Sequence, residues 1–340
     1  IQNICLQCGT CNTVCGGKLD IAGMILKLRT KFAQEDGLNP VHKFCLDTVA
    51  DRHLFHSMLR IASVAQGMIT KGQPMIRHLP MFLSGLTAGR SLPSVAPQPF
   101  RDILPTIKQD VPNPKGKIAI FTGCLLDFVY VDIATDVVKA LNMAGYIVEM
   151  PLGQACCGAP ATYMGDVENA KKAAEMNLNA MEAEKYDYIV SACPTCTHAL
   201  RDYVDFFKDD PEMLKKAEEL RSKTFDFCKL VSMLGGLPDT GDGVPMKVTY
   251  HDSCHLNRYL GVTKEQRELL KATKGVELIE MHDCDKCCGF GGSYSVKFPE
   301  MSAPILEEKI NNIVASGADV VAVDCPGCLL QIRGGLDARG

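Results

Sequence analysis

The segments KIAIFTGC (residues 117–124) and MKVTYHDSC (residues 246–254) decide the fold, because each is a short apolar run that ends on a cysteine. A run of this length predicts a buried β-strand. After each segment come a helical pattern, a second apolar run, a Cys-Cys pair, another helical pattern and a third apolar run that ends in Cys-x-x-Cys. Strands that alternate with helices predict an α/β unit with a mostly parallel sheet.

The cysteines indicate that this unit occurs twice. The two sets of five are Cys124, Cys156, Cys157, Cys193 and Cys196, and Cys254, Cys287, Cys288, Cys325 and Cys328. Self-similarity at a nearly constant offset is the signature of an internal repeat. Ligands collect at the carboxyl ends of strands in parallel sheets. We therefore expect one site in each copy.

Composition restricts the function. The chain has 340 residues, 22% charged residues and a net charge of −4, without the basic patch that nucleic-acid binding requires. No apolar run is long enough to span a bilayer, and no export signal opens the chain. The first residue is Ile1 rather than Met, which suggests that further sequence precedes it. We expect a cytoplasmic protein that binds no nucleic acid.

Seventeen cysteines are far more than such a chain normally carries. Disulfides would explain them in a small secreted domain. In a large chain without an export signal, clustered Cys-x-x-Cys and Cys-Cys pairs favour metal binding instead.

The N-terminal cysteines form a separate motif. Cys5, Cys8, Cys11 and Cys15 have the C-x2-C-x2-C-x3-C spacing of bacterial ferredoxins, which predicts a [4Fe–4S] cluster. Zinc is the alternative, because soft thiolate ligands suit both metals. Gly16 replaces the usual proline, and no second motif is present to share the fourth cysteine. The fourth ligand is then Cys15 or Cys45, unless a partner motif precedes Ile1.

Each repeat supplies five thiols where a structural zinc site needs four ligands. The side chains of adjacent cysteines on a turn point in different directions. They therefore suit two different metal atoms, or a site in which one thiolate bridges two irons. This favours an atypical, noncubane iron–sulfur cluster, unless one cysteine in each copy is not a ligand. Gly158 and Gly289 follow the pairs and would allow the backbone to approach the cluster closely.

Four segments are predicted along the chain. They are a small α-helical ferredoxin-like segment (1–44), a connector that is helical and then proline-rich and extended (45–115), a first cysteine-repeat domain (116–240) and a second (241–340). We expect helices over residues 20–33 and 263–273, and one with Ile133, Val137, Leu141 and Ala144 on one face.

The repeats resemble the CCG domains of the heterodisulfide-reductase-related iron–sulfur family. In that family a C-x31–39-CC-x35–36-CxxC pattern holds a noncubane [4Fe–4S] cluster, and both copies here fit those limits. HDSCH (251–255) and CCGFGGSYSVKFPEMS (287–302) are most similar to the lactate-utilisation branch. CLQCGTCNTVC (5–15) and GRSLPSVAPQPFR (89–101) resemble its ferredoxin-type partner subunit. That branch often lacks cysteines of the Cys-x-x-Cys elements, which are complete here.

The resemblance implies an iron–sulfur oxidoreductase subunit with one ferredoxin-type cluster and up to two noncubane clusters. A separate flavoprotein would oxidise lactate or glycolate, and this chain would pass the electrons to a quinone, cytochrome or ferredoxin. Such a hetero-oligomer could lie on the inner face of the membrane through a partner. The alternative is a heterodisulfide-reductase-like catalytic subunit that cleaves a disulfide. No catalytic side chain is identified, and no G-x-x-x-x-G-K-[ST] or G-x-G-x-x-G motif indicates nucleotide or flavin binding.

Other side chains near the motifs receive simpler interpretations. His198, His251 and His255 are expected to hydrogen-bond and orient the cysteine loops, although histidine can also bind metal. Cys228 and Cys284 have no counterpart in the other repeat and are expected to be ordinary thiols. Cys45, if it is not a ligand, is expected to be buried.

Overall fold

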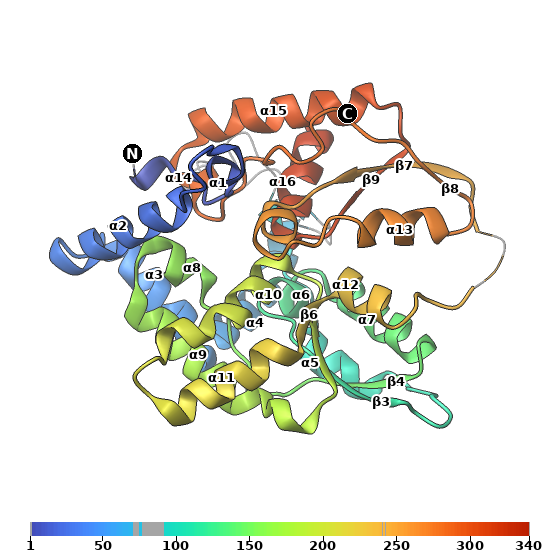
Figure 1. The fold of residues 1–340 in the computed structure, drawn as a ribbon, viewed down its shortest axis with the longest axis horizontal. Coiled ribbons are helices and arrows are strands. Elements are labelled where there is room, and N and C mark those ends of the chain that lie inside the picture. The colour runs from blue at the N-terminus through green and yellow to red at the C-terminus, as the bar shows by residue number, and fades with distance from the viewer. Residues whose placement is uncertain (1, 71–74, 77–91, 240, 242, 340) are drawn as a thin grey trace. The chain divides into compact units, whose positions relative to one another are not determined.

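The computed structural model describes residues 2–70, 75–76, 92–239, 241 and 243–339 (Figure 1). Their contacts divide the chain into two compact units. The first-repeat unit comprises Met24–Val64 and Val95–Pro238. The second-repeat unit comprises Ile1–Gly23, Ala65–Ser94 and Asp239–Gly340. Residues 77–91 of the proline-rich connector lie outside the described residues.

The sheet of the first-repeat unit is entirely parallel. Its order is β4 (Tyr146–Glu149), β3 (Gly116–Ile120), β5 (Tyr188–Ser191) and β6 (Thr224–Asp226). Its main helices are α3 (Pro40–Ala50), α5 (Phe100–Ile103), α6 (Leu125–Phe128), α7 (Val131–Met143), α8 (Ala159–Met164), α9 (Val167–Met181), α10 (Pro194–Arg201), α11 (Pro211–Lys223) and α12 (Phe227–Met233). Short 3₁₀ turns are η3 (Leu104–Thr106), η4 (Ala183–Lys185) and η5 (Asp202–Phe206).

The second-repeat unit repeats the first three strands in the same order. They are β8 (Val276–Leu278), β7 (Met246–His251) and β9 (Val320–Val323), again all parallel. Its helices are η1 (Gln2–Ile4), α1 (Thr10–Val14), the π-helical turn η6 (His255–Tyr259), α13 (Glu265–Ala272), α14 (Tyr294–Lys297), α15 (Pro299–Ala315) and α16 (Pro326–Asp337). The strands β1 (Met75–Ile76) and β2 (Leu92–Pro93) pair antiparallel. The predicted parallel α/β repeat is confirmed.

Local sequence explains the helix boundaries. The helices α2 (Ile21–Glu35) and α13 confirm the helices expected over 20–33 and 263–273, and α4 (Arg52–Thr70) forms much of the helical half of the connector. The amphipathic helix α7 ends before Gly145, whose φ of 95° no other residue adopts easily.

Among the described residues, no helix is long and apolar enough to cross a membrane.

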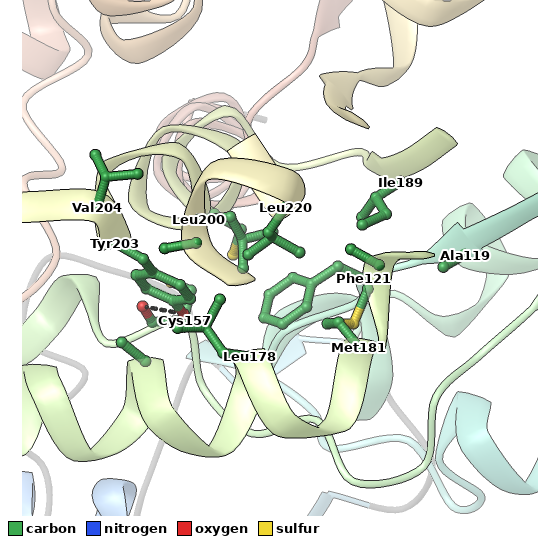
Figure 2. Close-up of a cluster of buried hydrophobic side chains, with 14 of the residues drawn as sticks. Ala119, Phe121, Cys157, Leu178, Met181, Ile189, Leu200, Tyr203, Val204 and Leu220 are labelled. Atoms are coloured by element: carbon green, nitrogen blue, oxygen red, sulfur yellow. Dashed lines mark hydrogen bonds between the residues drawn. The ribbon is translucent and has the colours of Figure 1, made fainter. Parts of the chain in front are cut away.

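The core of the first-repeat unit surrounds its sheet. Ile118, Ala119 and Ile120 of β3 are all fully buried, as expected for a central strand covered on both faces. Figure 2 shows the neighbouring cluster, in which Phe121 lies among apolar side chains from α9, β5, α10 and α11. Cysteines of the repeat belong to this same cluster. The cysteine site is therefore built into the core at the end of the sheet.

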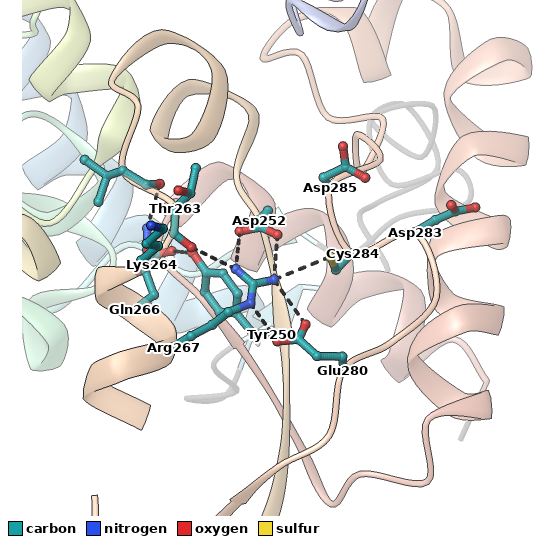
Figure 3. Close-up of polar contacts among 12 residues, drawn as sticks. Tyr250, Asp252, Thr263, Lys264, Gln266, Arg267, Glu280, Asp283, Cys284 and Asp285 are labelled. Carbon is teal, nitrogen blue, oxygen red and sulfur yellow. Dashed lines mark hydrogen bonds and ion pairs between the residues drawn. The ribbon is translucent and has the colours of Figure 1, made fainter. Parts of the chain in front are cut away.

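A polar network fixes the corresponding end of the sheet in the second-repeat unit (Figure 3). The Arg267 guanidinium donates to both carboxylate oxygens of Asp252, at 3.0 and 2.8 Å, and to those of Glu280, at 2.6 and 3.0 Å. It also lies 5.1 Å from the centre of the Tyr250 ring. These contacts join α13 to the segment that follows β7, and Asp252 lies two residues before Cys254.

Candidate metal centres

The first-repeat site brings together all five of its predicted cysteines. The side chains form a hydrogen-bonded series in the order Cys124, Cys156, Cys157, Cys196 and Cys193. The first follows β3, the adjacent pair lies in the loop between β4 and α8, and the last two belong to the start of α10. Four of the five are buried, and Cys124 is partly exposed.

The second-repeat site has the same arrangement. Its series runs in the order Cys254, Cys287, Cys288, Cys328 and Cys325, and the Sγ atoms of Cys288 and Cys328 are 3.4 Å apart. Each cysteine occupies the place of its counterpart in the first repeat. Two domains with different surroundings thus conserve one five-thiol geometry.

The Cys-Pro-x-Cys sequences explain how two thiols reach each site. Cys193 and Cys325 are the N-cap residues of α10 and α16, and a proline occupies the first helical position in both. Proline is favoured there because it lacks the N–H that would be unpaired. The second cysteine follows within the first turn, so both thiols lie at the amino end of one helix. That end favours a thiolate, because the helix dipole stabilises negative charge.

The thiols influence one another's protonation. The side chains of Cys156 and then Cys196 hydrogen-bond to Cys157 and lower its pKa to about 6. The hydrogen bond with Cys156 and burial raise the pKa of Cys124, and the hydrogen bonds with Cys157 and Cys193 do the same for Cys196. One sulfur in the series therefore accepts from its neighbours. A metal ion would replace those shared protons.

Two side chains that the sequence interpretation missed position the first Cys-Cys pair. The Asn177 amide donates to the carbonyl of Cys156 and to the Tyr203 hydroxyl, both at 2.9 Å. That hydroxyl donates to the carbonyl of Cys157 at 3.0 Å (Figure 2). Both side chains are almost fully buried. The only sequence signal was a polar residue on the apolar face of the helix over 166–183.

The glycine after each pair has a role in the turn and in packing, and the expected close approach of the backbone to a cluster remains a prediction. Gly158 and Gly289 have φ values of 81° and 83°, in the left-handed region. A Cβ atom on Gly289 would lie 2.9 Å from the carbonyl oxygen of Ser302, and one on Gly158 would lie 3.3 Å from that of Ala170. Glycine is thus needed for the turn and for the close approach of α9 in the first repeat and α15 in the second.

The expectation that nearby histidines orient the loops is confirmed for His198. Its ring contacts the Tyr163 hydroxyl at 3.4 Å and the Asp202 carboxylate at 3.2 Å. His255 instead stacks on Tyr259, with ring centres 5.2 Å apart.

The expectation is wrong for His251. Neither of its ring nitrogens has a hydrogen-bond partner among the described residues. Burial lowers the pKa of His251 to about 4, and the Lys309 ammonium acts in the same direction. The imidazole is therefore neutral at pH 7.

The cysteines outside the repeated motif and the N-terminal motif do not belong to the two series. Cys284 contacts the Arg267 guanidinium at 3.5 Å, and burial raises its pKa to about 11, so it remains a thiol. Cys228 follows the N-cap of α12 and is partly exposed. Cys45 on α3 is exposed, so the expectation of a buried thiol there was wrong.

The N-terminal motif folds as a loop followed by α1. Gly9 caps α1 with a φ of 73°, and Cys15 follows its last turn. The Gln7 main-chain N–H lies 3.4 Å from the Cys5 sulfur. The Asn12 side chain accepts the N–H of Ala22 at 2.9 Å. These contacts connect the loop to the start of α2.

This loop packs directly on the second-repeat site, within one unit. The Tyr259 hydroxyl donates to the carbonyl of Gln7 at 3.1 Å, and Arg258 lies 3.4 Å from that of Cys8. Cys8 hydrogen-bonds with Cys287, and this contact together with burial raises the pKa of Cys8. A thiol of the N-terminal motif therefore touches a thiol of the repeat, which the linear sequence did not indicate.

The donor sets suit iron–sulfur clusters. All fourteen predicted ligands are cysteines that form no disulfide, and soft sulfur donors select iron–sulfur clusters or zinc. In each repeat a buried, continuous series of five sulfurs exceeds the four ligands of a zinc tetrahedron.

Comparisons with known proteins agree with these sites. The model of the cysteine-rich CCG domain matches residues 118–201 and 248–333. The chain is 39% identical to lactate utilization protein A of Shouchella clausii over 224 residues, which cover 66% of this chain and 92% of that protein. Lactate utilization protein A of Bacillus subtilis is 37% identical, with 66% and 93% covered.

A third relative extends over nearly the whole chain. The probable glycolate oxidase iron-sulfur subunit of Bacillus subtilis is 31% identical, and the match covers 99% of this chain and 78% of that protein. The predicted resemblance is thereby confirmed. The chain belongs to the family of proteins that contain the CCG cysteine-rich domain, and it carries two copies of that domain.

Proposed function

We propose that this chain is the iron–sulfur electron-relay subunit of a flavin-dependent 2-hydroxy-acid dehydrogenase complex. The observation that carries the proposal is the contact between Cys8 and Cys287. It joins a ferredoxin-type motif to a CCG site inside one compact unit. Bound iron–sulfur clusters supply one-electron transfer at potentials that the surrounding protein sets. Two such sites in contact form a path for single electrons.

The ligand assignments follow from the thiol geometry. Cys5, Cys8, Cys11 and Cys15 would hold the N-terminal cluster, and the two five-thiol series would hold the CCG clusters. Asn177 and Tyr203 would keep the first Cys-Cys pair in place, because ligand orientation depends on such supporting hydrogen bonds. The segment boundaries 1–44, 45–115, 116–240 and 241–340 remain part of this proposal.

The partners are inferred from the relatives. Their names refer to lactate utilization and to glycolate oxidase, and oxidation of a 2-hydroxy acid releases two electrons together. A flavoprotein subunit would accept that pair and deliver single electrons to this chain. A quinone, cytochrome or ferredoxin would receive them, and a partner would provide any attachment to the inner face of the membrane.

Disulfide reduction is the second candidate, because both Cys-Pro-x-Cys elements are complete and join their series. The reaction would be R–S–S–R′ + 2e⁻ + 2H⁺ → RSH + R′SH. Turnover of a small-molecule disulfide by the isolated chain with a reduced viologen dye would favour this candidate. Absence of turnover, together with co-purification of a flavin dehydrogenase, would favour the relay.

The decisive experiment is anaerobic iron and sulfide analysis with EPR spectroscopy. We expect more iron than one four-iron cluster accounts for. Replacing Cys156 with Ser should abolish the signal of the first repeat and spare that of the second, and Cys287→Ser is the matched variant for the other site. About four irons, all lost with Cys5→Ser, would contradict the proposed CCG clusters.

A further inference from the structure

His251 is a buried imidazole whose polar atoms are unused. It is the last residue of β7 and has no exposed surface. Both ring nitrogens lack a hydrogen-bond partner among the described residues. Leaving buried polar atoms unpaired costs free energy, so each such case in a native protein needs an explanation, such as a bound ion.

The His251 ring lies close to two thiols of the second-repeat site. A ring nitrogen of His251 and the sulfurs of Cys288 and Cys328 all lie within 4.8 Å of one another, and all three residues are buried. The two sulfurs are 3.4 Å apart. Metal–nitrogen and metal–sulfur bonds of about 2.0 and 2.3 Å place the ligands of one tetrahedral metal about 3.5 Å apart. The three donors are thus arranged as ligands of one metal atom.

A metal-bound imidazole also needs a partner for its second nitrogen. Ligating histidines usually donate that N–H to a carboxylate, a backbone carbonyl or water. The backbone of Cys284 lies near the His251 ring, although not in hydrogen-bonding geometry. The Cys284 carbonyl already accepts the Asp252 N–H at 3.1 Å and the Lys309 ammonium at 3.2 Å, so a His251 N–H would share this acceptor with them.

The first repeat provides the comparison. His251 lies three residues before Cys254, and Phe121 lies three residues before Cys124. His251 is the last residue of β7, and Phe121 directly follows the equivalent strand β3. Both have no exposed surface, and Phe121 belongs to the core cluster that contains the first-repeat cysteines. Two sites with the same five-thiol order therefore differ here, because one has a ring that can bind metal and the other has a ring that cannot.

We propose that His251 is an imidazole ligand to an iron atom of the cluster at the second-repeat site, in addition to its cysteines. This inference rests on the proposed function, because it requires a cluster at that site. Imidazole is neutral, and its replacement of thiolate raises the potential in Rieske centres.

The test is pulsed EPR on the reduced, anaerobically purified full chain, with natural or ¹⁵N-labelled histidine. We expect a strong imidazole-nitrogen coupling that changes with the isotope. His251→Phe, which copies the first repeat, should remove the coupling. His255→Phe is the matched control, because His255 also adjoins Cys254, and it should retain the coupling. His251→Cys should give no coupling and a lower midpoint potential.

Iron and sulfide analysis tests the His251 ligand assignment separately from the proposed cluster at the second-repeat site. A cluster at the second-repeat site without histidine coupling in the labelled wild-type chain would overturn the ligand assignment alone, even if the variants failed to fold. Loss of the coupling in His255→Phe but not in His251→Phe would also overturn the ligand assignment. So would the finding that the site binds zinc in place of iron and that His251→Phe releases this zinc. Iron confined to the N-terminal motif would instead overturn the proposed cluster itself.

Discussion

The Tyr259 hydroxyl donates a hydrogen bond to the main-chain carbonyl of Gln7, 3.1 Å away, and so attaches the N-terminal cysteine loop to the second CCG domain. A Cβ atom on Gly9 would lie 3.1 Å from the Tyr259 ring, so the ring packs beside this glycine. We predict that Tyr259→Phe loosens the loop while keeping the ring in place. A lost hydrogen bond is worth about 1 kcal/mol, so amide exchange over residues 5–15 should accelerate about fivefold.

Hydrogen-exchange mass spectrometry measures this change. Amides of β3 in the other unit serve as the internal reference and should exchange at the wild-type rate. Unchanged exchange over residues 5–15 would mean that the hydroxyl does not hold the loop.

A buried ion pair stabilises the first-repeat unit. The Arg101 guanidinium donates to Asp127, at 2.7 Å from Nε, and Asp127 has no exposed surface. Arg101→Ala leaves that carboxylate buried and unpaired, which costs about 3–5 kcal/mol. We expect a correspondingly lower free energy of unfolding in urea titrations.

The exposed pair between Arg60 and Asp102 is the matched control. Its atoms are also close, at 2.7 Å, but the two side chains are 49% and 37% exposed. Exposed pairs contribute at most about 1 kcal/mol. Equal destabilisation by Arg60→Ala and Arg101→Ala would contradict the view that burial makes the difference.

Alanine at the glycine after each Cys-Cys pair should destabilise the two sites unequally. A left-handed backbone costs a residue with a Cβ atom about 1–2 kcal/mol. Gly289→Ala adds a contact at 2.9 Å with a main-chain oxygen, whereas Gly158→Ala adds one at 3.3 Å. Gly37→Ala, where φ is 75° and no atom lies within 4 Å of the added Cβ, reports the backbone strain alone. Thermal unfolding should rank the losses as Gly289, Gly158 and Gly37.

His56 should make the first-repeat unit sensitive to acid. Its ring packs on Phe128, with centres 5.0 Å apart. Burial, with Arg101 in the same direction, lowers its pKa to about 3. The unfolded chain binds a proton near pH 6.5, but the folded chain does not until about pH 3, so stability falls as the pH drops through this range. His56→Phe should therefore show a smaller loss of melting temperature between pH 7 and pH 5, and an unchanged loss would refute the assignment.

The sequence was sufficient to predict the repeat and the grouping of the cysteines in each copy. The regular offset of the cysteines and the strand-like runs before them predicted two parallel α/β domains, since both patterns are local. It did not predict Asn177 and Tyr203 as supports of the first pair, because their contacts with it bring together residues about 20 to 50 positions apart in the chain. It also gave His251 a hydrogen-bonding role, because unpaired ring nitrogens can be recognised only from the surrounding atoms.

Residue types and spacing alone thus predicted which thiols lie together in each repeat, since the ends of strands and the spacing of cysteines can be read from local sequence. Only the tertiary structure decided which sites touch. Cys8 meets Cys287, which is 279 residues away, because the N-terminal loop packs on η6 of the second CCG domain through Tyr259 and Arg258. That contact depends on long-range packing, which has no counterpart in the spacing of either motif.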